Sequence, residues 1–157
     1  MAFSAAKLER YAALGRERLR TGDLFEHPVV VVPIKTKGRW YGSISRAVVG
    51  KGVQLPELAL GCAEYRALEG GRAYLFVALW NDENTYSPAL IYECTGACLR
   101  LAARHALELV AFPLLGGNQG HRFIGAMELA VDDAMDECAE AELAMPEVIF
   151  VTDHELA

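Results

Sequence analysis

The sequence is short of positive charge: 15 Lys and Arg residues stand against 21 Asp and Glu residues, which gives a formal net charge of −6. A nucleic-acid surface needs many cationic side chains to neutralise phosphates, so direct nucleic-acid binding is disfavoured. No apolar run is long enough to span a bilayer, and no apolar signal-peptide segment follows the N-terminus. These absences favour a cytoplasmic protein without a membrane partner.

The four cysteines form no CxxC pair. Cys94 and Cys98 are four positions apart, which places both on one face of a helix. A metal site would need further ligands at a suitable spacing, and none follows nearby. We therefore expect no metal ion, no cofactor and a reducing compartment. The expected buried free thiols are Cys62, Cys94, Cys98 and Cys138.

Several sequence motifs of enzymes are missing as well. The sequence has no GxSxG elbow, which excludes a serine hydrolase of that type. It has neither GxGxxG nor GxxxxGK[ST], which disfavours a Rossmann dinucleotide site and a P-loop NTPase. What the chain does have is 157 residues, 53% of them hydrophobic and 23% charged. That is enough apolar material for one folded domain with a full core.

Apolar runs and helical periodicities alternate along the chain. Continuous aliphatic runs predict buried strands, and apolar residues that recur every three or four positions predict helices. The alternation predicts an α/β fold with a mixed central sheet and helices on both faces. We expect a single domain over residues 1–157, with an added N-terminal helix within 1–22 and a core over 28–152. The expected strands are 29–32, 73–80, 107–112 and 148–152, and the expected helices are 4–20, 43–49, 56–68, 88–105 and one from 122 onward.

A glycine-rich loop follows the strand expected at 107–112. The chain passes from Pro113 through this loop into the last helix, and a strand, a loop and a helix in that order are typical of anion-binding sites. Glycines let the backbone approach a ligand, and the free amides at a helix start favour phosphate. The alternative is an ordinary flexible connection. The expected ligand contacts are Leu115, Gly116, Gly117, Asn118, Gln119 and Gly120.

A second loop of the same kind precedes the helix expected at 43–49. Gly42, Ser43 and Ile44 run into its N-terminus. Two helix ends that face one cleft suit two phosphates better than one, so we expect these residues to bind the ligand. The alternative is that Ser43 simply caps the helix.

Basic and aromatic residues lie between the first strand and this second loop. Lys35, Lys37 and Arg39 follow the carboxyl end of the strand, where ligands bind in α/β sheets, so they are candidates for steering or binding a diphosphate. Trp40 lies beside them and is a candidate for stacking on a base. The alternatives are a solvated basic loop and a buried ring.

Three residues have side chains suited to catalysis. His121 closes the glycine-rich loop, and an imidazole exchanges protons near neutral pH. Lys35 and Lys51 each offer an amine, and Lys51 lies between two glycines. For each of the three, the alternative is an ordinary surface residue.

Together, these segments resemble a macrodomain, the ADP-ribose-binding α/β module. Residues 110–120 are similar to the family's strand, proline and glycine-rich phosphate loop, and residues 42–50 are similar to its other diphosphate loop and helix. The strand 74–80, followed by Thr85-Tyr-Ser-Pro88 opening a helix, most resembles one branch of the family. That branch includes the terminal ADP-ribose glutamate hydrolases and the antitoxins that remove ADP-ribose from DNA. The resemblance covers residues 28–152 and implies a three-layer sandwich.

The chain departs from the family's pattern in several places. Residues 33–36 hold the place of an asparagine-rich motif, and His121 stands where the glutamate hydrolases have an acidic residue. Lys35 or Lys51 would take the part of that branch's lysine. No family-like aspartate for the adenine amino group is evident near His27.

The resemblance implies that the chain binds ADP-ribose or a related nucleotide diphosphate. One alternative is a hydrolase that removes ADP-ribose from protein or nucleic acid, in which Lys35 or Lys51 acts at the anomeric carbon and His121 transfers protons. A second alternative is a macro-fold interaction protein without a ligand, including a homodimer formed through the N-terminal helix.

Overall fold

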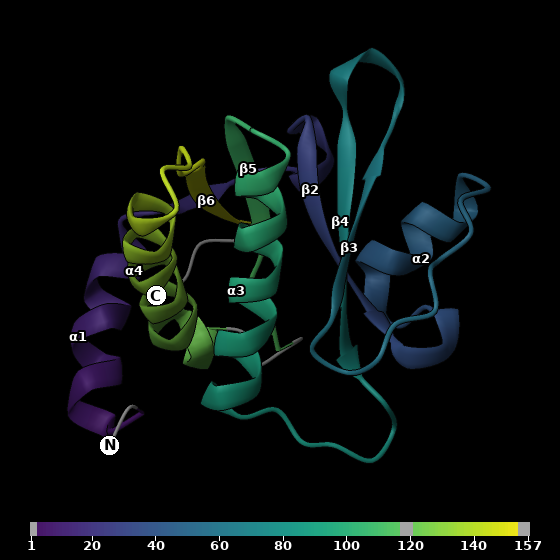
Figure 1. Ribbon diagram of the computed structural model, residues 1–157. Coiled ribbons are helices and arrows are strands. Elements are labelled where there is room, and N and C mark those ends of the chain that lie inside the picture. The colour runs from purple at the N-terminus through teal and green to yellow at the C-terminus, as the bar shows by residue number, and fades with distance from the viewer. Residues whose placement is uncertain (1–2, 117–120, 154–157) are drawn as a thin grey trace.

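A mixed six-stranded sheet lies between two layers of helices in the computed structural model, which describes residues 3–116 and 121–153 (Figure 1). The strand order is β1-β6-β5-β2-β4-β3, and neighbours are parallel except β3, which pairs antiparallel with β4. The strands are β1 (Leu19–Thr21), β2 (Val29–Lys35), β3 (Ala63–Ala67), β4 (Ala73–Trp80), β5 (Leu109–Pro113) and β6 (Glu147–Thr152). The helices are α1 (Ala5–Arg16), α2 (Gly42–Gly50), α3 (Pro88–Arg104) and α4 (Ile124–Glu140), with 3-10 turns η1 (Leu24–Glu26), η2 (Thr36–Gly38) and η3 (Glu69–Gly71).

The strands β2 and β4 are buried on both faces. Every residue of β2 except the last is buried, and the same holds for β4. Because successive side chains point to opposite faces of a sheet, Val31 and Val77 pack with α3 and α4, whereas Val32 and Phe76 pack with α2. The continuous apolar runs that predicted these strands are what a sheet covered on both faces requires.

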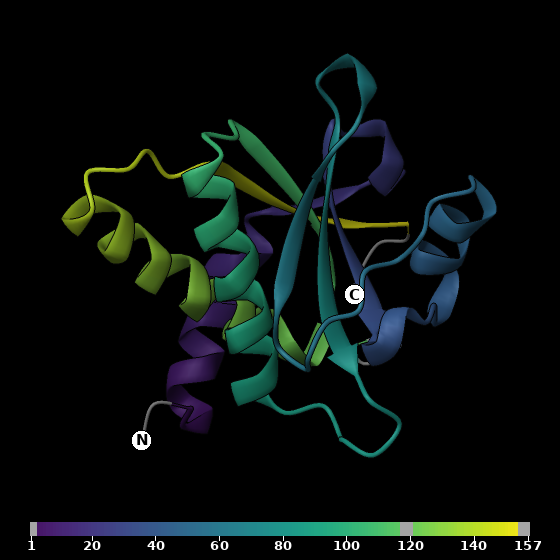
Figure 2. The same cartoon turned by 45° about the vertical axis from the view of Figure 1, so that its right-hand side comes forward.

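Helices cover both faces of the sheet, which confirms the predicted three-layer α/β fold. The helices α3 and α4 lie on one face, and α2 lies on the other (Figure 2). The helix α1 packs on α4 through close backbone contacts: Gly15 is buried against Ile124, and a Cβ on Gly125 would overlap the Leu8 carbonyl. Glycine is therefore required at both helix surfaces for this approach.

Two predictions for the N-terminal half are wrong. The helix expected over 4–20 ends at Arg16, and Leu19–Thr21 form the edge strand β1, which pairs with β6. The helix expected over 56–68 is absent from that described segment, where Ala63–Ala67 form the strand β3 instead.

The apolar spacing that misled the second prediction has a simple structural cause. Tyr65 packs with the α3 layer, whereas Leu58 and Leu68 pack with the α2 layer. The residues that looked like one stripe of a helix therefore belong to two faces of a sheet.

The strand expected at 29–32 is longer than predicted. It continues through Pro33 to Lys35 as β2, and Pro33 pairs with Val77 of β4. On its other side, β2 pairs with β5 at Val30 and Ala111. Beyond that pair, neither Pro33 nor Pro113 has an N–H to donate to the neighbouring strand. The two strands therefore separate toward their carboxyl ends.

Three of the four cysteines are buried as predicted, and burial raises the pKa of the Cys94 thiol to about 12. Cys62 is exposed, so its predicted burial is wrong, because it precedes β3 instead of lying on an apolar helix face. Within residues 3–116 and 121–153, no three His, Cys, Asp or Glu side chains are grouped to hold a metal ion. None of the described helices has the length and apolar character to cross a membrane.

Candidate functional site

A cleft of about 930 Å³ opens where β2 and β5 separate. Five parallel strands end at its wall, which includes Thr21, Pro33, Leu79, Pro113 and Thr152. The chain leaves β2 toward α2 and leaves β5 toward α4, on opposite faces of the sheet. Open α/β sheets bind ligands at such a switch point, beyond the carboxyl ends of the strands.

The N-terminus of α2 forms one wall of the cleft through Gly42, Ser43 and Ile44. No side-chain hydrogen bond caps this helix end within the described part of the chain. Instead, the buried Ser45 Oγ accepts from Tyr41 N at 2.9 Å and donates to Tyr41 O at 2.5 Å. The amides of the first helical turn are therefore left for a partner in the cleft, where the helix dipole favours an anion.

Gly116, where the glycine-rich loop begins, also belongs to the cleft wall. Gly116 lines the cleft with φ of 114°, a backbone conformation that favours glycine. The Leu115 side chain is fully buried in the core, so it makes no part of the wall. The other predicted contacts lie outside the described residues: Gly117, Asn118, Gln119 and Gly120.

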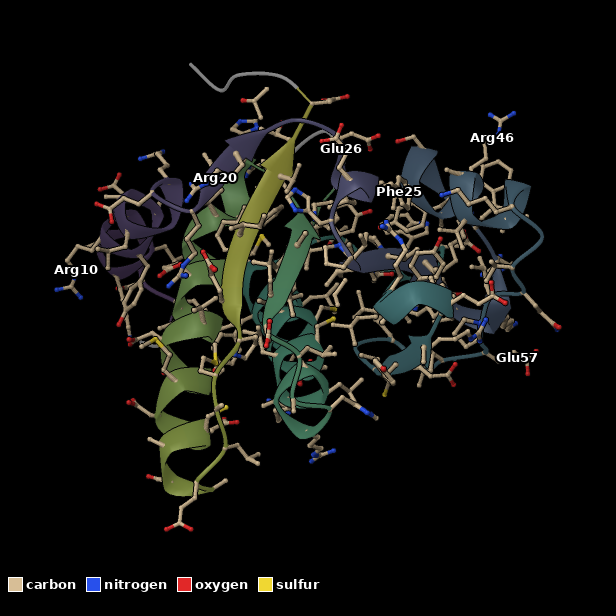
Figure 3. All side chains as sticks on the ribbon, turned by 90° about the horizontal axis from the view of Figure 1, so that it is seen from above. Arg10, Arg20, Phe25, Glu26, Arg46 and Glu57 are labelled. Atoms are coloured by element: carbon tan, nitrogen blue, oxygen red, sulfur yellow. The ribbon has the colours of Figure 1, made fainter. Side chains whose placement is uncertain are left out.

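The segment around η1 forms a third wall, which the sequence did not predict. Asp23 and Phe25 line the cleft, and Asp23 Oδ1 accepts from Phe25 N at 2.9 Å as the cap of η1. Figure 3 shows Phe25 on the side of η1 that faces α2. An Asp one residue after Gly22 is a recognisable turn and cap sequence. It was missed because its place beside the cleft depends on the pairing of β1 with β6.

Tyr41 lines the cleft between α2 and the end of β4, with Tyr86 behind it. Tyr86 Oη donates to Tyr41 Oη over 3.2 Å, and the Tyr86 ring lies 5.3 Å from Trp80 and 6.4 Å from Phe123. Burial raises the pKa of the Tyr41 hydroxyl. The phenol therefore stays protonated and keeps a proton to donate.

The predicted basic group lies outside the cleft wall. Asp82 pairs with both Lys35 (Nζ–Oδ1, 3.0 Å) and Arg39 (Nη1–Oδ2, 2.5 Å), and these cations hold the pKa of Asp82 below its usual value. Lys37 is exposed on η2. The described residues that line the cleft include neither lysine nor arginine, so backbone amides and the side chains of residues such as Tyr41 and His121 are the candidate groups for an anion there.

The other predicted residues have separate positions. His121 lines the cleft. Lys51 caps the C-terminus of α2, and its Nζ lies 4.4 Å from the centroid of the Phe25 ring. Trp40 lies in a neighbouring hollow, with its surface 48% exposed. The structure thus brings Gly42, Ser43, Ile44, Gly116 and His121 to one cleft, and their roles there stay predictions.

No protein-family model matches the sequence, and no curated protein sequence matches it. Solved structures match its fold. A Trypanosoma brucei macrodomain in complex with ADP-ribose aligns with a TM-score of 0.65 and 14% identity, over 87% of this chain and 63% of that one. The macrodomain of Mycobacterium tuberculosis DarG aligns with a TM-score of 0.60 and 14% identity, over 85% and 96% of the two chains. That of Thermus aquaticus DarG aligns with a TM-score of 0.58 and 16% identity, over 87% and 97%.

The chain therefore has the macrodomain fold that the resemblance predicted. It spans 63% of the Trypanosoma brucei chain, and nearly all of each DarG macrodomain. At 14–16% identity these alignments establish the fold alone, so the function of the cleft rests on its own residues.

Proposed function

We propose that the chain binds ADP-ribose, or a related nucleotide diphosphate, in the cleft between α2 and the glycine-rich loop. The observation that carries this proposal is the N-terminus of α2, where Gly42, Ser43 and Ile44 line the cleft and no described side chain caps the helix. Uncapped amides at the positive end of a helix attract an anionic linker. The Trypanosoma brucei structure with the same fold was solved with ADP-ribose.

The other walls suit the two ends of such a ligand. The Phe25 ring offers an apolar surface to a base, and the carboxylate of Asp23 can accept a hydrogen bond from an exocyclic amino group. Tyr41 and His121 place polar groups on the remaining wall, where they can meet ribose hydroxyls. The ligand would therefore be held by backbone dipoles at its phosphates and by side chains at its ends.

The substitution Ser43→Glu tests the anion site directly. Ser43 is exposed in the first turn of α2, where a carboxylate is favourable to the helix dipole, so we expect the variant to fold with an unchanged or higher Tm. The same carboxylate repels the phosphates, so ADP-ribose affinity should fall about a hundredfold or more, because like charges placed together cost several kcal/mol. Calorimetric titration and thermal unfolding measure the two effects.

The matched control is Ser43→Gln, which has the size of glutamate without its charge. We expect its affinity to stay within about threefold of the wild type, because the amides remain available. Full affinity in Ser43→Glu would place the diphosphate elsewhere. Failure of the wild type to bind ADP-ribose at all would reject the proposed function and favour an interaction protein without a ligand.

Hydrolysis of an ADP-ribose linkage is a second candidate function, favoured by His121 on the cleft wall. An attacking amine would come from Lys35 or Lys51, and each would first leave its present partner, Asp82 or the Phe25 ring. Incubation with ADP-ribosylated protein and nucleic acid tests this function. Loss of turnover in His121→Ala and in one lysine variant, with ADP-ribose binding retained, would support it. No release from any linkage by the wild type would reject it.

A further inference from the structure

A second hollow adjoins the cleft at the N-terminus of α2. Its volume is about 470 Å³, and it is lined by Trp40, Gly42, Ser43, Arg46 and Ala47. Gly42 and Ser43 belong to the walls of both hollows. A ligand whose phosphates meet these amides therefore has one of its ends beside Trp40.

The Trp40 ring is a large aromatic surface that the fold leaves half exposed, at 48%. The Arg46 guanidinium carbon lies 5.4 Å from the ring centroid, so the two side chains form a cation–π pair. By contrast, the other tryptophan, Trp80, packs on Tyr86 with ring centroids 5.3 Å apart. An exposed aromatic ring beside an arginine is the platform on which planar bases stack in nucleotide recognition.

The two aromatic side chains near the ligand lie at opposite ends of α2. Phe25 contacts Lys51, the C-cap of the helix, whereas Trp40 precedes its first residue. A helix of 9 residues is about 14 Å long at 1.5 Å per residue. Figure 3 shows Arg46 pointing outward from α2, away from the sheet, and Phe25 on η1. The amides of the first turn lie along the helix between these two ring positions.

We propose that Trp40 and Arg46 bind a second planar ring, so that the ligand of this protein is a dinucleotide. This inference rests on the proposed function, because the diphosphate must occupy the cleft for its far end to reach the platform. The first ring lies beside Phe25 and Asp23, and the diphosphate meets the α2 amides. The second ribose carries a base-sized planar ring that stacks on Trp40.

A comparison of NADH with ADP-ribose tests the platform. Both compounds contain the same adenosine diphosphate ribose unit, and NADH adds a neutral planar ring to the second ribose. In calorimetric titrations we expect NADH to bind the wild type about tenfold more tightly than ADP-ribose, the size expected for stacking one ring on an aromatic side chain. Trp40→Ala should remove this advantage and leave ADP-ribose affinity unchanged, whereas Trp40→Phe should keep most of it.

The control variant is Val49→Ala, which changes an exposed apolar residue of the same helix that lines neither hollow. It should leave both affinities unchanged. Equal affinity of the wild type for the two compounds would overturn the platform, and so would an NADH advantage that survives Trp40→Ala or disappears in Trp40→Phe. In each of these cases ADP-ribose still binds and the proposed function stands. If neither compound binds, the proposed function and the platform both fall.

Discussion

The N-termini of α2 and α3 use the same residue type in opposite ways. At α3, Ser87 Oγ accepts from Leu90 N at 3.2 Å and Pro88 occupies the first turn, so the helix end is closed by its own residues, as the sequence predicted. At α2, the serine lies inside the helix, and Ser45 bonds back to the main chain of Tyr41. One serine satisfies a helix end, and the other supports an open one. When the polar side chain of a helix start bonds to the residue before the helix, the amides of the first turn remain available to a partner.

Removal of the Ser45 hydroxyl should have the largest effect, because it should lower both the stability of the protein and its affinity for ADP-ribose. Ser45→Ala leaves the N–H of the half-buried Tyr41 without its side-chain acceptor and removes one of the bonds to Tyr41 O, which should cost about 1–3 kcal/mol of stability. Because the first-turn amides lose their support, ADP-ribose affinity should fall about tenfold. Chemical denaturation and calorimetry measure the two losses. Reduced stability with full affinity would show that the open helix end needs no support from Ser45.

Removal of the Ser87 hydroxyl should have a smaller effect, confined to stability. Ser87→Ala deletes the cap of α3 and should cost about 1 kcal/mol of unfolding free energy. Since Ser87 does not line the cleft, the ADP-ribose affinity of the Ser87→Ala variant should stay at the wild-type value. A parallel loss of ADP-ribose affinity would mean that the closed end of α3 and the open end of α2 are coupled.

Neutralising Asp82 should have the smallest effect. Its pairs with Lys35 and Arg39 are exposed, and such pairs contribute little to stability, so Asp82→Asn should leave Tm nearly unchanged. Because the pKa of Asp82 is lowered below 3.8 in the folded state, its contribution is present above pH 3.8 and is lost as the pH falls below that value. Thermal unfolding at neutral pH and in acid checks this. A large change in the ADP-ribose affinity of Asp82→Asn would indicate that Lys35 or Arg39 contributes to ligand binding.

The sequence predicted the parts of the fold that are set locally. The strands β2, β4 and β6 were evident because their continuous apolar runs match burial on both faces, and α3 was evident from Ser87 and Pro88. The strands β1 and β3 were missed because each is short, half exposed and paired with a single neighbour. Edge strands of this kind depend on a partner far away in the chain and carry no periodicity of their own.

The same division holds for the site. Gly42, Ser43 and Ile44 were predicted because a helix start marks its own amides in the sequence. Asp23 and Tyr86 were not, because their places follow from tertiary contacts: the pairing of β1 with β6, and the approach of Tyr86 to Tyr41. The position of Lys35 was predicted from the strand end, but its partner Asp82 comes from the loop after β4.

The prolines of β2 and β5 keep the two strands apart at the cleft because of their own covalent structure. Since Pro33 and Pro113 carry no amide hydrogen, neither can donate a backbone hydrogen bond to the other strand at the carboxyl ends of β2 and β5. A molecule that enters between the carboxyl ends of β2 and β5 therefore has no backbone hydrogen bonds between Pro33 and Pro113 to break.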